Sequence, residues 1–186
     1  NDEARAAFCQ RFAFNTSEKV NASVTLVRPF AQLNLGTTLE SLNIDYEIDV
    51  TASKVTVTSP ARYFNVNTGM AHPQTPAPVE FALATNPQQY LNVNDTDYEY
   101  VAMNYFLVSG NTSSVDVLFD IQTDKGTVTD KFVAQVPVQK NYRTNIIGNL
   151  LTKETKIEIV VDNRFAGDWN GGMDGDFTEV PNPDYN

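Results

Sequence analysis

Apolar and polar residues alternate in many short segments of this chain. In residues 20–27 every second residue is apolar, and after Pro29 the apolar positions shift by one and continue through Leu33 and Leu35. Side chains on a β-strand point alternately to its two faces, so this period of two predicts strands. A proline cannot donate a hydrogen bond to a neighbouring strand, so the change of face across Pro29 is typical of a strand that kinks at a sheet edge.

Longer segments in the second half of the chain extend the pattern. Residues 98–108 are apolar on both faces, which predicts a central strand covered on both sides. Residues 115–121 and 128–136 alternate cleanly, and residues 124–126 (Asp-Lys-Gly) between them are typical of a turn. The two segments therefore predict a hairpin, which we expect to end at Pro137.

The remaining segments predict an all-β fold with one short helix. Residues 1–11 contain helix formers behind a capping residue and predict an N-terminal helix. Residues 146–151 and 157–161 predict a last strand pair, and no βαβ alternation occurs. The prediction is a single domain over residues 1–166, an antiparallel two-sheet β-sandwich. Residues 167–186 are rich in Gly, Asp and Pro, and we expect a flexible C-terminal tail.

Composition narrows the possible functions. The net charge of −10 argues against nucleic-acid binding, because phosphate contacts require Lys and Arg. The longest apolar run, near residues 101–108, is far shorter than the ~20 residues that a membrane-spanning helix needs. Cys9 is the single cysteine, so no internal disulfide can form. The composition is that of a domain stabilised by an apolar core.

Few residues could carry catalysis. His72 is the only histidine, and it precedes a proline-rich stretch that predicts a loop over residues 70–78. A histidine metal cluster is therefore impossible, and a Ser-His-Asp triad would depend on His72 alone. Asp45, Glu47 and Asp49 share one face of a predicted strand, and we interpret them as solvated side chains. Glycosidase carboxylates usually face each other across a cleft.

Two further groups of residues have chemical alternatives. Residues 168–176 are rich in Asp and Gly, as calcium loops are, but their spacing does not fit an EF-hand. An acidic tail and a calcium site both stay open there. Tyr63, Trp169 and Tyr185 could form a sugar-binding platform or could pack in the core or loops. No catalytic, cofactor-binding or metal-binding residue is assigned, and we expect a non-enzymatic protein without a cofactor.

Three stretches of the chain resemble a known family. Residues 27–34 read VRPFAQLN, residues 100–108 read YVAMNYFLV, and residues 136–152 read VPVQKNYRTNIIGNLLT. In order and spacing they are similar to the C-terminal domain of Bacteroides-type fimbrillins, the subunits of type V pili, and the third stretch is the most specific. The resemblance spans residues 2–168.

The resemblance implies a transthyretin-like β-sandwich that serves as a structural subunit of a cell-surface pilus and contributes to adhesion. Its location would be extracellular, in a fimbrium at the outer membrane surface. Its partners would be other pilin subunits, joined by addition of a strand from one subunit to a sheet of the next, and host surfaces or glycans. The lipidated cysteine and the cleavage site of the family belong to an N-terminal domain without a counterpart in this sequence. They are therefore not assigned to Cys9 or to any arginine here.

A surface carbohydrate-binding β-sandwich is the alternative function. A row of exposed aromatic side chains over a concave sheet would favour it. Within the third stretch, residues 141–145 are predicted to be structural, because polar side chains there can satisfy backbone groups where the chain turns into the last strand pair.

Overall fold

A computed structural model describes residues 7–17, 19–38, 48, 50–58, 60–72, 79–84, 90–109, 112–151 and 157–162. This part of the chain forms eleven β-strands and contains no helix. The strands are β1 (Phe30–Thr38), β2 (Val50–Val57), β3 (Tyr63–Asn65), β4 (Met70–His72), β5 (Val79–Ala84), β6 (Tyr90–Val93), β7 (Thr96–Leu107), β8 (Thr112–Thr123), β9 (Gly126–Gln139), β10 (Arg143–Gly148) and β11 (Ile157–Asp162).

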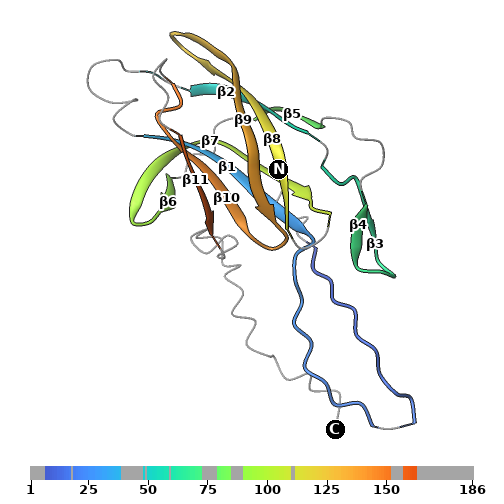
Figure 1. Ribbon diagram of the computed structural model, residues 1–186. Coiled ribbons are helices and arrows are strands. Elements are labelled where there is room, and N and C mark those ends of the chain that lie inside the picture. Colours follow the sequence, from blue (N-terminus) through green and yellow to red (C-terminus); the bar gives the residue numbers. More distant parts are fainter. Residues whose placement is uncertain are drawn as a thin grey trace.

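The strands form two larger sheets and one two-stranded ribbon (Figure 1). One sheet has the order β11-β10-β1-β7-β6, the other has the order β5-β2-β8-β9, and β3 pairs with β4. A single apolar cluster contains side chains of both larger sheets, among them Leu33 of β1, Val55 of β2, Phe119 of β8 and Ile146 of β10. The two sheets therefore pack face to face around this core, which confirms the all-β prediction.

One strand pair departs from the predicted antiparallel arrangement. β1 runs parallel to β10, with Gln32 opposite Arg143 and Leu35 opposite Ile146, while its other neighbour β7 is antiparallel. Parallel neighbours need a long crossover connection, and here strands β2 to β9 separate the two in sequence. The five-stranded sheet is therefore mixed, and the prediction of a purely antiparallel fold was wrong at this pair.

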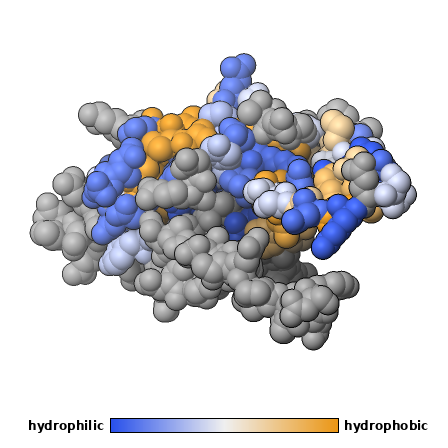
Figure 2. Space-filling model, turned by 90° about the horizontal axis from the view of Figure 1, so that it is seen from below, coloured by the Kyte–Doolittle hydropathy of each residue, from blue (hydrophilic) through white to orange (hydrophobic). Residues whose placement is uncertain are grey.

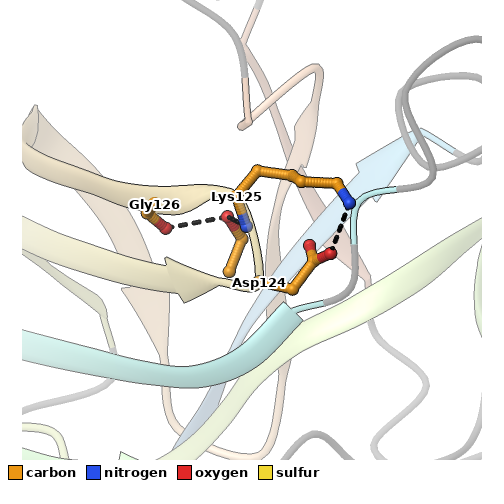
Figure 3. Close-up of polar contacts among 4 residues, drawn as sticks. Asp124, Lys125 and Gly126 are labelled. Atoms are coloured by element: carbon orange, nitrogen blue, oxygen red, sulfur yellow. Dashed lines mark hydrogen bonds and ion pairs between the residues drawn. The ribbon is translucent and has the colours of Figure 1, made fainter.

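The second half of the chain follows the predicted strands closely. β7 is buried on both faces over residues 100–104, as expected of a covered strand. β8 and β9 form the predicted hairpin, and at its turn Lys125 Nζ lies 2.9 Å from the carboxylate of Asp124 (Figure 3). Pro137 does not end the hairpin, because β9 continues to Gln139 with Pro137 opposite Ser114. β9 is an edge strand, where the missing N–H of a proline is tolerated.

The N-terminal segment differs from its prediction. Residues 1–6 of the predicted helix lie outside the described residues, and residues 7–11 are not helical. Cys9 instead forms an antiparallel bridge with Val27, with N–H to O distances of 2.9 and 3.2 Å. Residues 7–17 and 19–28, which we call the arm, extend away from the sandwich as two legs that lead into β1 (Figure 1). Most of the strand predicted near residues 44–50 and the whole tail predicted over residues 167–186 lie outside the described residues.

Candidate functional site

The three fimbrillin-like stretches come together in the middle of the five-stranded sheet. The first lies largely in β1 and the second in β7, while the third runs from the end of β9 through the β9–β10 turn into β10 and the residues after it. Gln32 of β1 lies opposite Tyr105 on one side and Arg143 on the other, and Asn34 lies opposite Met103 and Asn145 in the same way. Three segments that are separated in sequence, residues 27–34, 100–108 and 136–152, thus contribute to three adjacent strands, β10-β1-β7, which we call the central strands.

Polar side chains on the central strands are buried. Gln32, Asn34, Arg143 and Asn145 are between 0% and 3% exposed, and they lie on the sheet face opposite the main core because they alternate with residues such as Leu33. We call these four residues the polar row. The face that they share also carries a second apolar cluster, which is formed by Leu91, Val93, Tyr100, Met103 and Ile147.

Hydrogen bonds join the polar row across strands. Asn34 Nδ2 donates to Asn145 Oδ1 over 2.7 Å, and Gln32 Nε2 donates to Met103 Sδ over 2.8 Å. Arg143 Nη2 forms an ion pair of 2.7 Å with Asp162 of β11. The Arg143 side chain is 4% exposed and the Asp162 side chain is 13% exposed. Buried polar contacts of this kind have few alternative arrangements, so they fix the register between β1, β10 and β11.

The polar row is not fully satisfied. Among the described residues, four buried atoms of the row have no hydrogen-bond partner: Gln32 Oε1, Asn34 Oδ1, Asn145 Nδ2 and Arg143 Nε. A buried unpaired polar atom typically costs about 1–3 kcal/mol. The unpaired atoms therefore reduce what the polar row contributes to stability, while its paired atoms join β1 to β7 and β10, and β10 to β11.

The β9–β10 turn is attached to β1 by main-chain hydrogen bonds. Asn141 has φ +66°, and its N–H donates to Phe30 O over 2.8 Å, while its Oδ1 accepts from Arg28 N–H over 3.2 Å. Gln32 N–H donates to Tyr142 O over 3.0 Å. Thr144 Oγ1 donates to the Pro137 carbonyl over 2.7 Å. Residues 141–145 thus satisfy backbone groups where β9 turns into β10, in agreement with the structural role predicted for them.

The other candidate residues do not form a site in the described part of the chain. His72 is exposed and ends β4 opposite Tyr63, so it belongs to a strand and not to the predicted loop. Tyr63 is 57% exposed. The described residues contain no group of three His, Cys, Asp or Glu that could hold a metal, and no helix long and apolar enough to span a membrane. Asp45, Glu47, Asp49, residues 168–176, Trp169 and Tyr185 lie outside the described residues.

The edge strand β9 carries two irregularities that the sequence pattern did not reveal. Asp130 and Gln135 have φ of +57° and +53°, and the ladder between β8 and β9 shifts register near both. Their N–H groups donate to the carboxylates of Asp120 and Asp116, each over 2.9 Å. Bulges and a proline are features that discourage another strand from pairing with an edge. Asp116 and Asp120 are the residues in the sequence that accept hydrogen bonds at these irregularities. The alternating pattern indicated only that both lie on a polar face of a strand.

Four large apolar side chains of the arm are exposed. Phe12 and Phe14 are 49% and 60% exposed, with ring centroids 5.8 Å apart, and Val20 and Leu26 are 45% and 58% exposed. Near the base, the Arg28 guanidinium lies 4.5 Å from the centre of the Phe8 ring. Figure 2, which views the molecule from below, shows apolar side chains in separate patches between hydrophilic ones.

Comparison with known proteins gives one family match and distant structural similarities. A family model described as a family of unknown function, DUF6562, matches residues 1–181. No curated protein is significantly similar to the chain. A candidate cell adhesion protein of Bacteroides ovatus is similar in structure with 14% identity and a TM-score of 0.43, over 76% of this chain and 48% of that one.

Two further solved structures also have low sequence identity and low TM-scores with this chain. A candidate cell adhesion protein of Bacteroides fragilis has 9% identity and a TM-score of 0.36, over 75% of this chain and 47% of that one. A non-hemolytic pneumolysin of Streptococcus pneumoniae has 14% identity and a TM-score of 0.33, over 75% of this chain and 25% of that one. The chain spans about half or less of the length of each structure, and these similarities are too distant to indicate a function.

Proposed function

We propose that this chain, which belongs to the DUF6562 family of unknown function, is a structural subunit of a cell-surface pilus. The observation that supports the proposal is the convergence of the three fimbrillin-like stretches on the central strands β10-β1-β7. A resemblance that arose by chance in separate parts of the sequence has no reason to place Gln32 beside Arg143 and Asn34 beside Asn145. The resemblance instead coincides with one physical unit that organises the sheet.

We further propose the fold type, the location and the partners that the resemblance to fimbrillins implies. The sandwich is of the transthyretin-like kind, the subunit is non-enzymatic, and the pilus lies outside the cell at the outer membrane surface and contributes to adhesion. Its partners are other pilin subunits, and its polymerisation uses strand addition, in which main-chain hydrogen bonds supply affinity and alternate side chains supply specificity.

The strand edges of the described residues differ in their suitability for strand addition. The four-stranded sheet ends at β5 and β9, and the five-stranded sheet ends at β11 and β6. β9 is unsuitable because of its two bulges and Pro137. We therefore assign strand addition to an edge other than β9.

The arm is the second surface that we assign to assembly. Phe12 and Phe14 of the arm are 49% and 60% exposed, and covering them in a subunit interface would gain about 25 cal/mol for each Å² of apolar surface removed from water. Phe12 and Phe14 are adjacent, so one apolar patch of a neighbouring subunit could cover both rings. Aromatic residues are also enriched among the residues that dominate the energy of interfaces.

Assembly of the purified chain tests the proposal. Size-exclusion chromatography and negative-stain electron microscopy over a concentration series should show oligomers or filaments for the natural sequence. The double substitution Phe12→Ser and Phe14→Ser should reduce assembly and leave the melting temperature unchanged, because both rings are exposed.

A matched control removes an exposed ring from the edge strand β9. Phe132 is 60% exposed, and Phe132→Ser should assemble like the natural sequence. A chain that stays monomeric at every concentration would contradict the pilus subunit proposal. Equal assembly of the Phe12/Phe14 variant and the natural sequence would contradict the role of the arm.

In the described part of the chain, no observation favours the alternative function, in which a row of exposed aromatic rings would stack against a carbohydrate. The exposed aromatic side chains there lie on separate elements: Phe12 and Phe14 on the arm, Tyr63 on β3, Tyr90 on β6 and Phe132 on β9. A sugar platform needs several rings in one row.

A further inference from the structure

A small cavity lies where three segments distant in sequence meet. Its walls are residues 9–11 of the arm, residues 66, 68 and 69 of the turn between β3 and β4, and Lys140 of the β9–β10 turn. Its volume is about 170 Å³. That is smaller than the ~300–1,000 Å³ of pockets for drug-sized ligands, so the cavity suits one small molecule.

Two cations line this cavity, although the chain is strongly acidic. The sequence has 13 Lys and Arg against 23 Asp and Glu, yet the cavity lining includes Arg11 and Lys140, and none of its seven described residues is acidic. Two positive charges at one concave surface raise the local concentration of anions. Such a positive site is unexpected on a surface of net charge −10.

The two cations are also available for a ligand. In the described part of the chain, most Lys and Arg side chains are engaged, as Arg143 is with Asp162 and Lys125 with Asp124. The exceptions, with no ion pair or hydrogen bond, are Arg11, Lys19 and Lys140, and two of these three line the cavity. Arg11 is exposed and Lys140 is half-buried, so both can reach a molecule in the cavity.

Each wall of the cavity is held in place by hydrogen bonds of its own. The Cys9–Val27 bridge fixes the base of the arm. In the β3–β4 turn, Gly69 N–H donates to Asn65 O over 2.8 Å, and Asn65 Oδ1 accepts from Thr68 N–H over 3.2 Å. Tyr142 N–H donates to Gln139 O over 3.1 Å across the turn that carries Lys140. A site whose walls are already ordered loses less entropy when a ligand binds.

We propose that this cavity binds a small carboxylate, with Arg11 and Lys140 as the charged contacts and the Gln10 amide and Thr68 hydroxyl as neutral hydrogen-bonding groups. A carboxylate matches the fork of a guanidinium, and an ammonium adds a second charge-assisted hydrogen bond. The carboxylate could belong to an acidic sugar or to a simple organic acid. This ligand site goes beyond the proposed assembly role and does not depend on it.

Titration of the full chain with three probes tests the proposal and distinguishes the two sources. Glucuronate, glucose and acetate are added separately, and amide chemical shifts of Thr68, Gly69 and Asn141 are followed by NMR. We expect glucuronate to shift these amides and glucose, which has the same ring without the charge, to leave them unchanged. If acetate also binds, the site takes simple carboxylates; if it does not, the site takes acidic sugars. The proposal is overturned if neither glucuronate nor acetate shifts these amides, or if glucose shifts them as glucuronate does.

Charge reversal identifies the contacts. Arg11→Glu and Lys140→Glu should each weaken glucuronate binding roughly tenfold or more, the effect of losing one charge-assisted hydrogen bond. Lys19→Glu changes the net charge equally and also lies on the arm, but Lys19 does not line the cavity, so its affinity should match the natural sequence. An equal loss in all three variants would show attraction by net charge alone and would overturn the site.

Discussion

β1 and β9 are both long strands of this sandwich, but their surroundings are opposite. Every residue of β1 from position 31 to 37 is buried, whereas β9 alternates between exposed and half-buried residues over most of its length. β1 lies between two strands in the middle of its sheet, and β9 lies at an edge. Polar residues in β1 are therefore inside the protein and must find partners there, while those in β9 can bond to water.

Polar contacts of similar length differ in how far they are buried, and we expect them to differ in their contribution to stability. The Arg143–Asp162 and Asp124–Lys125 ion pairs are 2.7 and 2.9 Å long, but the first is almost fully buried and the second is largely exposed. Asn34–Asn145 and Asn92–Asp97 are both 2.7 Å, and again one is buried and the other exposed. Each buried contact thus has a matched exposed control in the same chain.

The largest expected effect is that of breaking the buried ion pair. Arg143→Ala leaves the Asp162 carboxylate in a largely buried place without its cation, and we expect a loss of about 3–5 kcal/mol in the free energy of unfolding. Lys125→Ala removes the exposed partner of Asp124 and should cost less than about 1 kcal/mol. Urea denaturation measures the free energy of unfolding of both variants. Equal losses would show that burial does not determine how much the two ion pairs contribute to stability.

The next effect concerns the buried amide pair. Asn34→Ala leaves a buried oxygen of Asn145 without its donor, so the free energy of unfolding should fall by about 1–3 kcal/mol. A double-mutant cycle with Asn145→Ala should give a coupling energy of about 0.5–3 kcal/mol, because the two residues are in direct contact. Asn92→Ala is the exposed control, and its loss should stay within about 0.5 kcal/mol. Additive losses at Asn34 and Asn145 would count against the pairing.

Gly36 tests how closely the second apolar cluster covers β1. A Cβ atom at Gly36 would lie 2.8 Å from Leu91 Cδ2 and 3.0 Å from Tyr98 Cβ, so Gly36→Ala should lower stability by about 1–3 kcal/mol through crowding. Gly69 has φ +67° and open space around it, and Asn tolerates that conformation. Gly69→Asn should therefore change the melting temperature little. A stable Gly36→Ala variant would mean that this face is loosely packed.

The smallest effect is expected on β9. Phe132 is 60% exposed, so Phe132→Ser should change the free energy of unfolding by no more than about 0.5 kcal/mol. Thermal unfolding followed by circular dichroism is sufficient to measure it. A loss comparable to that of Arg143→Ala would show that β9 is covered in solution.

The two regions also differ in how far the sequence predicted them. The β8–β9 hairpin joins neighbouring segments through a short turn, so alternation and turn residues were enough to predict both strands and their pairing. β1 was predicted as a strand, with Leu33 and Leu35 on one face, and the strand predicted at residues 146–151 overlaps β10, but their parallel pairing was not predicted. The expected position of the strand after Pro29 at a sheet edge was wrong, because β1 lies between β10 and β7. Their pairing joins residues 111 positions apart, as at Asn34 and Asn145, and local periodicity contains no information on such a contact.

Local context also explains the remaining differences. Pro137 was expected to end the hairpin, because a proline breaks a ladder, but the edge position of β9 lets it stay within the strand. The cavity with Arg11 and Lys140 could not be predicted, because one segment of the arm and two turns from separate parts of the chain form it. The resemblance of residues 136–152 indicated a special segment, and only the structure shows that Asn141 and Tyr142 attach it to β1.

Native-state hydrogen exchange tests whether the fimbrillin-like stretches form the structural framework of the fold. The account predicts that amides of Leu33 and Leu35 in β1 and of Asn145 and Ile147 in β10 exchange only through global unfolding, since both strands are bonded on both sides. Amides of Asp130 and Gln135 on β9 should exchange through local opening at a much lower free energy. If the β1 and β10 amides exchanged as fast as those of β9, the central strands would not be the framework of the fold, and the account would be contradicted.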